Sequence, residues 1–183
     1  MAELTLEHIR HSLAHVLASA VMEMFPKAQL GVGPVIEHGF FYDFLLPRPL
    51  TPEDVKKLEK RMRELVKQKL SFERTEMSTK EAKKFFEERS QSFKVELIED
   101  LEKAGTTQVS IYKTGKFIDL CRGGHVENTS QIDPQSFKLD KIAGAYWRGS
   151  EKNPQMQRIY GLAFSSAEEL ATHLKMLEEA KKR

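Results

Sequence analysis

Four side chains in two short stretches have the types and the spacing of metal ligands or proton-transfer groups. His11 and His15 stand four residues apart, and Cys121 and His125 are separated by the same interval. On a helix, residues four apart share one face, so the imidazoles of the first pair project together. Together the two pairs supply the nitrogen and sulfur donors of a tetrahedral zinc site. The spacing permits zinc but does not require it.

Each pair also has a purely structural interpretation. Two histidines at this spacing are typical of a half-buried, hydrogen-bonded feature, and a lone cysteine is most often a small buried hydrophobe. The first pair lacks the glutamate of a His-Glu-x-x-His zinc protease. Asp119 lies two residues before Cys121, and such residues share one face of a strand with Phe117. Two clusters with an acidic residue between them favour a site over unrelated structural features.

Periodicity predicts the elements that must position these residues. A helix begins after Thr5 and ends before Pro26, and its apolar residues recur at helical spacing. The segment 30–44 places glycines and a proline among aromatic and β-branched residues, which indicates strand, turn and strand. Thr51 and Pro52 begin a second helix, whose solvent-facing charges alternate in sign.

Further helices and hairpins follow along the chain. Capping pairs and a terminal glycine mark the helices, and alternating residues mark the strands. Helices mixed with an antiparallel sheet predict an α+β domain with a long N-terminal helix and a last helix at the C-terminus. The expected elements are a helix capped by Ser78 and Glu81, a helix over 95–104 ended by Gly105, hairpin strands over 108–121 and 136–164, and a last helix capped by Ser165 and Glu168.

Composition and charge exclude several classes of protein. The chain has 183 residues, 40% hydrophobic and 31% charged, which suits one globular domain with a buried core. Its 29 basic and 27 acidic side chains give a net charge of +2, so a polyanion would have to be held locally. No apolar run reaches the roughly 18 residues of a membrane span, and no signal-peptide pattern is found. We therefore expect a cytoplasmic protein with no membrane partner and, with one cysteine, no intrachain disulfide.

Five stretches occur in a specific order: HSLAH (11–15), GVGPVIEHGFFYDF (31–44), SFKVELI (92–98), DLCRGGH (119–125), and AGAYWRG (143–149) followed by QRIYG (157–161). In this order they resemble the editing domain of bacterial-type threonyl-tRNA synthetases. A related pair of His-x-x-x-His and Cys-x-x-x-His patterns marks alanyl-tRNA synthetase editing domains, but the second and last stretches favour the threonyl branch. The resemblance covers nearly the whole chain.

The resemblance implies a hydrolase that removes serine from mischarged seryl-tRNA(Thr), by attack of water on the aminoacyl ester at the tRNA 3′ end. A synthetic site that accepts threonine cannot strongly exclude serine, because one missing methyl group changes binding by only about 1–3 kcal/mol. A second site therefore has to hydrolyse the smaller product. The implied partners are the 3′ end of tRNA(Thr) carrying serine and the remainder of a threonyl-tRNA synthetase.

The resemblance also implies the roles of individual residues. Lys94 and His11 would orient or activate the water, and Asp119 would hold the amino group of the substrate. Tyr42 and the Gly33 backbone would contact the amino acid or the terminal ribose. Without the resemblance, each of these residues has a structural interpretation. Lys94 is typical of an exposed surface, Asp119 of an ion pair and Tyr42 of core packing. The implied catalytic residues are His11, His15, Lys94, Cys121 and His125, and the implied substrate-binding residues are Gly33, Tyr42 and Asp119.

No cofactor is required by the threonyl resemblance, whereas the alanyl relatives resemble zinc-binding domains. If zinc is bound, its ligands would be His11, His15, Cys121 and His125. A non-catalytic, zinc-stabilised RNA-binding module and an alanyl-type editing domain are therefore open alternatives. A thiol hydrolase that uses Cys121 with His125 is a third.

The resemblance also sets expected boundaries. It assigns residues 1–164 to the editing domain and residues 165–183 to a linker helix towards a synthetase core that this sequence does not contain. One position departs from the family pattern, because Gly124 stands where a proline is common. We expect this glycine to loosen the turn that carries His125.

Overall fold

Helices and antiparallel strands follow one another in the computed structural model, which describes residues 5–182. Residues 1–4 and 183, which the expected ranges 1–164 and 165–183 include, lie outside the described residues. The helices are α1 (Leu6–Met24), α2 (Pro52–Lys67), α3 (Thr79–Glu88), α4 (Ser92–Lys103) and α5 (Ala167–Lys181), with short 3₁₀ turns η1 (Thr129–Gln131) and η2 (Trp147–Gly149). The strands are β1 (Gln29–Leu30), β2 (Val35–Ile36), β3 (Gly39–Leu45), β4 (Phe72–Ser78), β5 (Gln108–Thr114), β6 (Phe117–Leu120), β7 (Phe137–Tyr146) and β8 (Gln155–Ala163).

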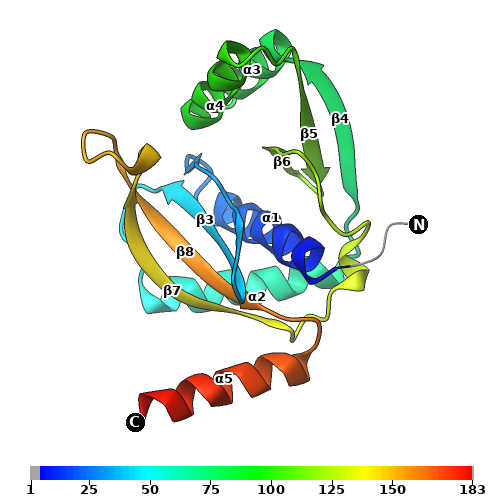
Figure 1. The fold of residues 1–183 in the computed structure, drawn as a ribbon, viewed down its shortest axis with the longest axis vertical. Coiled ribbons are helices and arrows are strands. Elements are labelled where there is room, and N and C mark those ends of the chain that lie inside the picture. The colour runs from blue at the N-terminus through cyan, green and yellow to red at the C-terminus, as the bar shows by residue number, and fades with distance from the viewer. Residues whose placement is uncertain (1–4, 183) are drawn as a thin grey trace.

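The strands form two antiparallel sheets (Figure 1). The larger sheet has the order β1-β3-β8-β7, with β2 also paired to β3, and the smaller sheet has the order β4-β5-β6. Helices α1 and α2 pack with the larger sheet, whereas α3 and α4 pack on one face of the smaller sheet and form a separate core with it. The predicted α+β class is confirmed, and the division of the strands into two sheets was not predicted.

Helix α1 lies between the two sheets and is the buried centre of the fold. Every residue from Ser12 to Val21 is buried, because β3 and β8 contact the helix from the larger sheet and β5 and β6 contact it from the smaller one. A helix surrounded in this way is apolar on most of its faces. Even so, no helix within residues 5–182 is long and apolar enough to span a membrane. This position of α1 places its histidines at the junction of the sheets.

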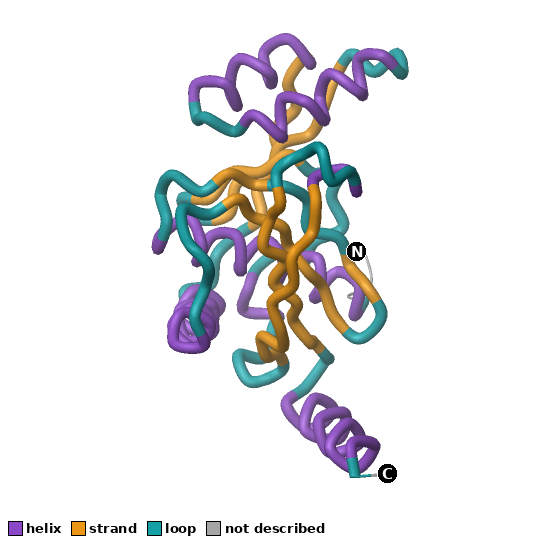
Figure 2. Tube along the Cα trace, turned by 90° about the vertical axis from the view of Figure 1, so that its left-hand side faces the viewer, coloured by secondary structure: helices purple, strands orange, loops and turns teal. Residues whose placement is uncertain are grey.

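Helix α5 lies at the opposite end of the molecule from α3 and α4 (Figure 2). It buries Leu170 and leaves Met176 and Leu177 61% and 41% exposed. The predicted last helix is therefore present, but its cap was predicted one residue too early. The side chain of Ser166, and not that of Ser165, accepts the capping hydrogen bond.

The start of α4 also differs from the prediction. The helix begins at Ser92, three residues before the predicted start, and this extra turn places Lys94 on the helix. Its N-cap residue Gln91 makes no side-chain cap. The amide of Gln91 instead bonds to β1 and the residue before it, since its oxygen accepts from the Leu30 N–H at 2.8 Å and its nitrogen donates to the Ala28 carbonyl at 3.0 Å. Gln91 thereby ties α4 to the larger sheet.

The predicted caps of α1 and α2 are confirmed, and the cap of α2 includes an ion pair. Thr5 caps α1, and Thr51 forms a reciprocal capping box with Asp54. The Asp54 carboxylate also accepts two hydrogen bonds from Arg48, at 2.6 Å and 3.1 Å. The Arg48 guanidinium, and then the Thr51 backbone, hold the pKa of Asp54 well below its ordinary value of 3.8. The charged form is therefore the one that stabilises the fold.

Replacing Asp54 with asparagine is expected to lower the free energy of unfolding near pH 7 by about 1 kcal/mol, as for other lost caps. Because the folded-state pKa lies below the unfolded-state value, this contribution is present above about pH 4 and declines as the pH falls below it. Urea unfolding of both proteins across this range gives the difference. The control is Glu53→Gln in the same helical turn, and an Asp54→Asn penalty that does not change with pH would contradict the prediction.

Candidate active site

His11, His15, Cys121 and His125 converge from α1 and from the turn that follows β6. Their potential ligand atoms all lie within 4.8 Å of one another. The sulfur of Cys121 lies 3.2 Å from Nε2 of His11 and 3.5 Å from Nε2 of His125. The two pairs that the spacing singled out therefore form one cluster.

The cluster forms because β6 runs beside α1 with a matching repeat. Four residues of a helix rise about 6 Å, and two residues of a strand rise about 6.6 Å, so every fourth helical residue meets every second strand residue. Cys121 accordingly lies beside His11, and Oδ2 of Asp119 lies 3.9 Å from Nε2 of His15. The ring of Phe117 is 5.9 Å from that of His15. The predicted common face of the strand is confirmed.

The turn after β6 depends on two glycines. Gly123 and Gly124 have φ values of 113° and 92°, in the region that favours glycine. A proline, whose φ is fixed near about −65°, could not adopt the conformation of Gly124. A Cβ atom at Gly124 would lie 3.6 Å from Nδ1 of His11 and 3.8 Å from Cδ2 of His8. The turn therefore passes close to the first turns of α1, with His8 beside it and outside the four-residue cluster.

Four rings lie against the imidazole of His125 in the described part of the chain. Phe72 stacks on it at 5.0 Å and 10°, and His11 stacks at 4.3 Å and 24°. His15 meets it edge-on at 4.4 Å, and Tyr112 is tilted against it at 4.5 Å. Sequence analysis missed both Phe72 and Tyr112. Tyr112 pairs with Asp119 in the β5–β6 hairpin, so its register was a usable signal. Phe72 belongs to a distant strand, and its local sequence carries no such signal.

A buried ion pair adjoins the cluster. The ammonium of Lys94, from α4, lies 2.8 Å from Oδ1 of Asp119, and the hydroxyl of Tyr42, from β3, donates to Oδ2 at 2.6 Å. Lys94 also donates to the Tyr42 oxygen at 3.1 Å, and the Leu120 N–H donates to Oδ1. Both charged side chains are only 3% exposed. Asp119 thus joins three elements of the fold, and its 3.9 Å contact with His15 joins them to the imidazoles.

Gly33 lies against the ring of Tyr42. A Cβ atom at Gly33 would overlap Cδ2 of that ring, so only glycine allows the chain to approach so closely. The aromatic ring of Tyr42 also stacks on Phe44 at 4.8 Å. The Tyr42 hydroxyl is therefore held towards Asp119 by contacts on its ring. The eight residues implied by the resemblance accordingly lie in one region of the molecule.

Burial keeps the cluster uncharged near neutral pH. It lowers the pKa of His125 to about 2, with the neighbouring imidazoles of His15 and His11 adding to the effect. Burial likewise lowers the pKa of His11, and it lowers that of His15 further. It raises the pKa of the Cys121 thiol to about 11. The neutral imidazoles can accept protons, whereas the scarcity of thiolate weakens the interpretation of Cys121 as a nucleophile.

The four donors match the ligand types of a tetrahedral zinc site, and all lie within 4.8 Å of one another. Bond lengths of about 2.0 Å to nitrogen and about 2.3 Å to sulfur put neighbouring ligands about 3.3–3.5 Å apart. The distances from Cys121 to the two imidazoles match this value. The surroundings are less suitable, because Nδ1 of His15 and of His125 are buried without a partner among residues 5–182, and metal-bound histidines usually donate from the second nitrogen. These residues therefore form a group that can hold zinc but lacks the usual supporting acceptors.

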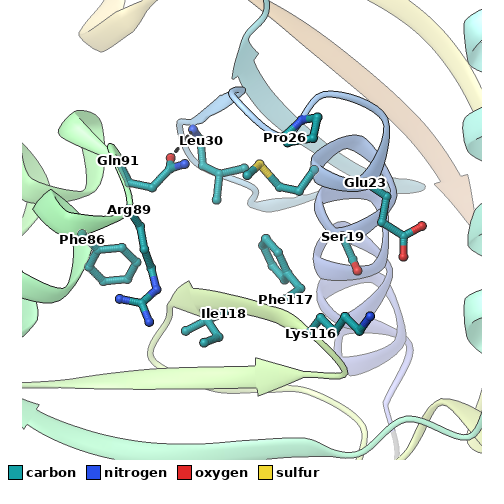
Figure 3. A pocket seen from close by; sticks show the side chains of 11 residues that line it. Ser19, Glu23, Pro26, Leu30, Phe86, Arg89, Gln91, Lys116, Phe117 and Ile118 are labelled. Atoms are coloured by element: carbon teal, nitrogen blue, oxygen red, sulfur yellow. Dashed lines mark hydrogen bonds between the residues drawn. The ribbon is translucent and has the colours of Figure 1, made fainter.

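Of two hollows near the smaller sheet, one reaches the cluster and the other does not. One, of about 600 Å³, is bordered by Cys121 and Arg122 and lies between α4 and the β5–β6 hairpin. The other, of about 380 Å³, follows the C-terminal half of α1, where Ser19 and Phe117 line it and Gln91 holds its bond to β1 (Figure 3). The first is within the size range of small-ligand sites and reaches a member of the cluster.

The Lys94–Asp119 pair can be tested by removing its charges one at a time. Lys94→Met leaves a buried carboxylate without its cation and is expected to lower the free energy of unfolding by about 3–5 kcal/mol. The double variant Lys94→Met with Asp119→Asn removes both charges and should be more stable than Lys94→Met alone. Urea unfolding of the two single variants and the double variant measures the coupling. Purely additive losses would contradict the pairing.

Comparison of the sequence with known proteins finds a family of domains and a group of relatives. Residues 109–160 match the family described as "Threonyl and Alanyl tRNA synthetase second additional domain". This chain is also similar to proteins named threonine–tRNA ligase. The identity is 56% over 97% of the chain for Dehalococcoides mccartyi (strain BAV1), 52% over 97% for Citrifermentans bemidjiense, and 53% over 96% for Marinobacter nauticus. The chain spans 29%, 27% and 27% of the lengths of these relatives. Residues 109–160 therefore match the second additional domain of threonyl- and alanyl-tRNA synthetases, and nearly the whole chain is similar to one region of proteins named threonine–tRNA ligase, in agreement with the editing domain that the sequence motifs resemble.

Proposed function

We propose that this domain proofreads tRNA(Thr) by hydrolysing the ester that links a wrongly attached serine to its 3′ end. The observation that carries the proposal is the junction at Asp119, where a buried Lys94 and Tyr42 meet the imidazole cluster. The relatives are named threonine–tRNA ligases, and a ligase that accepts threonine needs a second site to remove serine. A water, a proton acceptor and hydrogen-bond donors to the ester are what such a site requires.

In the proposed reaction, Lys94 and His11 prepare the water. An ammonium has three N–H groups, and Lys94 directs two of them to Asp119 and Tyr42, which leaves one for the water or the ester carbonyl oxygen. The neutral imidazole of His11 accepts a proton as the water oxygen bonds to the carbonyl carbon. The tetrahedral intermediate then loses the ribose oxygen, which receives the proton. Serine and a tRNA with a free 3′-terminal hydroxyl are the products.

The substrate is held by the remaining polar groups. The Asp119 carboxylate offers about four acceptor positions and meets three donors, from Lys94, Tyr42 and Leu120, so one position is left for the amino group of serine. The Gly33 backbone and Tyr42 contact the amino acid or the ribose. The hollow of about 600 Å³ beside Cys121 gives the terminal nucleoside room.

The proposal requires no metal ion, because its proton acceptor and its cation are side chains of the chain itself. Zinc, where bound, would be held by His11, His15, Cys121 and His125 and would lower the pKa of a bound water. The positive charge of Lys94 near His15 opposes the binding of a further cation. In the metal-free reaction, His15 and His125 pack around the water, and Cys121 packs against His11 and His125.

The four-donor cluster supports one alternative, a non-catalytic RNA-binding module that zinc stabilises. This alternative predicts one bound zinc ion per chain, unfolding when the metal is chelated, and no hydrolysis of any aminoacyl ester. Metal analysis of the purified protein, beside a deacylation assay before and after chelation, separates it from the proposed hydrolase. Hydrolysis that persists in metal-free protein would exclude this alternative.

Replacing His11, Lys94 or Cys121 with alanine is expected to reduce the deacylation of seryl-tRNA(Thr) at least about tenfold, since a positioned proton-transfer group alone contributes about 100-fold or more. These residues come from three segments, so an equal effect of all three would reflect one site. The matched control is His8→Ala, which removes an imidazole from the same helix outside the cluster. Circular dichroism and urea unfolding identify any variant that loses activity by unfolding.

Wild-type rates in all three variants would mean that the clusters are structural. The Lys94 variant needs the most care, because it also breaks a buried ion pair. The deacylation rate of Lys94→Ala is therefore measured at a temperature below the midpoint of its thermal unfolding. It is compared with the rate of Lys94→Met.

Selectivity tests the second-sieve role most directly. Seryl-tRNA(Thr) is expected to be hydrolysed at least about tenfold faster than threonyl-tRNA(Thr), because the extra methyl either clashes with the pocket or displaces the water, and a shift of about 1 Å can reduce the rate a hundredfold. Alanyl esters should react slowly, since they lack the hydroxyl that satisfies polar groups of the pocket. Initial rates for the three esters on one tRNA measure this.

Each outcome of that comparison has a distinct meaning. Equal rates for serine and threonine would contradict the second-sieve proposal. Faster release of alanine would favour the alanyl-type editing domain. Uncatalysed ester hydrolysis is subtracted with a reaction that contains no protein.

A further inference from the structure

Ser12 connects the two halves of the imidazole cluster through its hydroxyl group. The hydroxyl donates to the carbonyl of His8 at 2.7 Å, one helical turn earlier, and accepts from the backbone N–H of Val126 at 2.9 Å. Ser12 is 0% exposed and Val126 is 3% exposed, so the bond is shielded from water. It joins α1, between His11 and His15 in sequence, to the residue that follows His125.

The segment that this bond holds has little rigidity of its own. The N–H of Cys121 is bonded to the Ser110 carbonyl at 3.2 Å, and this bond fixes the start of the turn on β5. Gly123 and Gly124 follow, and glycine has the largest conformational freedom of any residue. The place of His125 is therefore set by the far end of the turn and by the rings around the imidazole. The bond to Ser12 holds that far end on α1, and the next residue, Glu127, accepts a bond from the Phe72 N–H at 3.3 Å on the side of β4.

We propose that Ser12 is a positioning residue, whose hydroxyl sets the distance of His125 from Cys121 and His11 by holding the Val126 amide on α1. The effect of Ser12 on the position of His125 is argued from the contacts of this chain. Its effect on the rate of hydrolysis rests on the proposed function. Alanine at this position would leave the Val126 N–H buried without an acceptor, which favours a shifted turn. Lys94, Asp119 and Tyr42 lie on other elements and would keep their contacts.

Histidine NMR tests the effect of Ser12 on the position of His125 without any assay of activity. The 183-residue chain is labelled at histidine, and the ring signals of His125 are assigned with a His125→Gln variant. Ser12→Ala is expected to shift or broaden these signals, while those of His38 and His173, on distant parts of the fold, stay in place. The matched control is Ser19→Ala, two turns further along α1, where the side chain lines the hollow in Figure 3.

A conservative variant and the wild-type protein keep the test decisive. Ser12→Thr retains the hydroxyl and should keep the His125 signals near their wild-type positions. In the wild-type chain, the Val126 amide should exchange with solvent much more slowly than that of Arg122, which lies in the exposed part of the turn. Fast exchange at Val126, or unchanged His125 signals in a folded Ser12→Ala protein, would overturn the proposal. The exchange measurement needs no variant and so applies even if Ser12→Ala fails to fold.

Steady-state kinetics test the consequence for hydrolysis. Ser12→Ala is expected to lower kcat for seryl-tRNA(Thr) at least about tenfold while KM changes less than about twofold, because a displaced group affects the reaction more than substrate binding. Ser19→Ala should match the wild type. A rise in KM with unchanged kcat would contradict the positioning role. If the wild-type chain hydrolyses no ester while the NMR result holds, the proposed function fails and the geometric role of Ser12 stands.

Discussion

The ion pair of Lys94 and Asp119 is the constraint on which the arrangement of this domain depends. Removing two charges from water carries a penalty of several kcal/mol for each ion, and it is offset only when geometry and further hydrogen bonds are good. The required partners come from α4, β3 and β6, which belong to different sheets and cores. The two sheets therefore have to hold one relative position, and Gln91 stabilises it by bonding α4 to β1.

The pair also contributes to the uncharged state of the adjoining cluster. Burial is the main cause that lowers the pKa of His15 and of His125, and the positive charge of Lys94 lowers the pKa of His15 further. The imidazoles are therefore neutral and keep a nitrogen lone pair, but they bind a proton less readily than an exposed histidine does. The buried ammonium of Lys94 thus places a positive charge beside neutral rings.

Much of this site could be predicted because local periodicity sets its two halves. The faces of α1 and β6 follow from repeats of about 3.6 and 2 residues, and these repeats brought His11, His15, Asp119 and Cys121 to common faces. Lys94, Tyr42 and Gly33 were implied only by the resemblance to a family. Ser12 and Phe72 could not be predicted, since their partners are distant in sequence.

The predicted start of α4 at residue 95 was wrong for a physical reason. A cap and acidic residues usually mark a helix start, but the side chain of Gln91 bonds to β1, and the first turn contains the cation Lys94, which the helix dipole disfavours. Asp119 offsets that charge from another strand. Both departures from the local rules serve to place Lys94 beside Asp119.

The matched repeats of α1 and β6 have a consequence for insertions and deletions. One residue inserted into α1 between His11 and His15 would rotate the second imidazole by about 100° around the helix, and one inserted into β6 would turn the residues on one side of it to the opposite face. Either change would disperse the cluster while leaving every one of its members in the sequence. The number of residues in each of these two segments therefore matters to the cluster as much as the identity of the residues does.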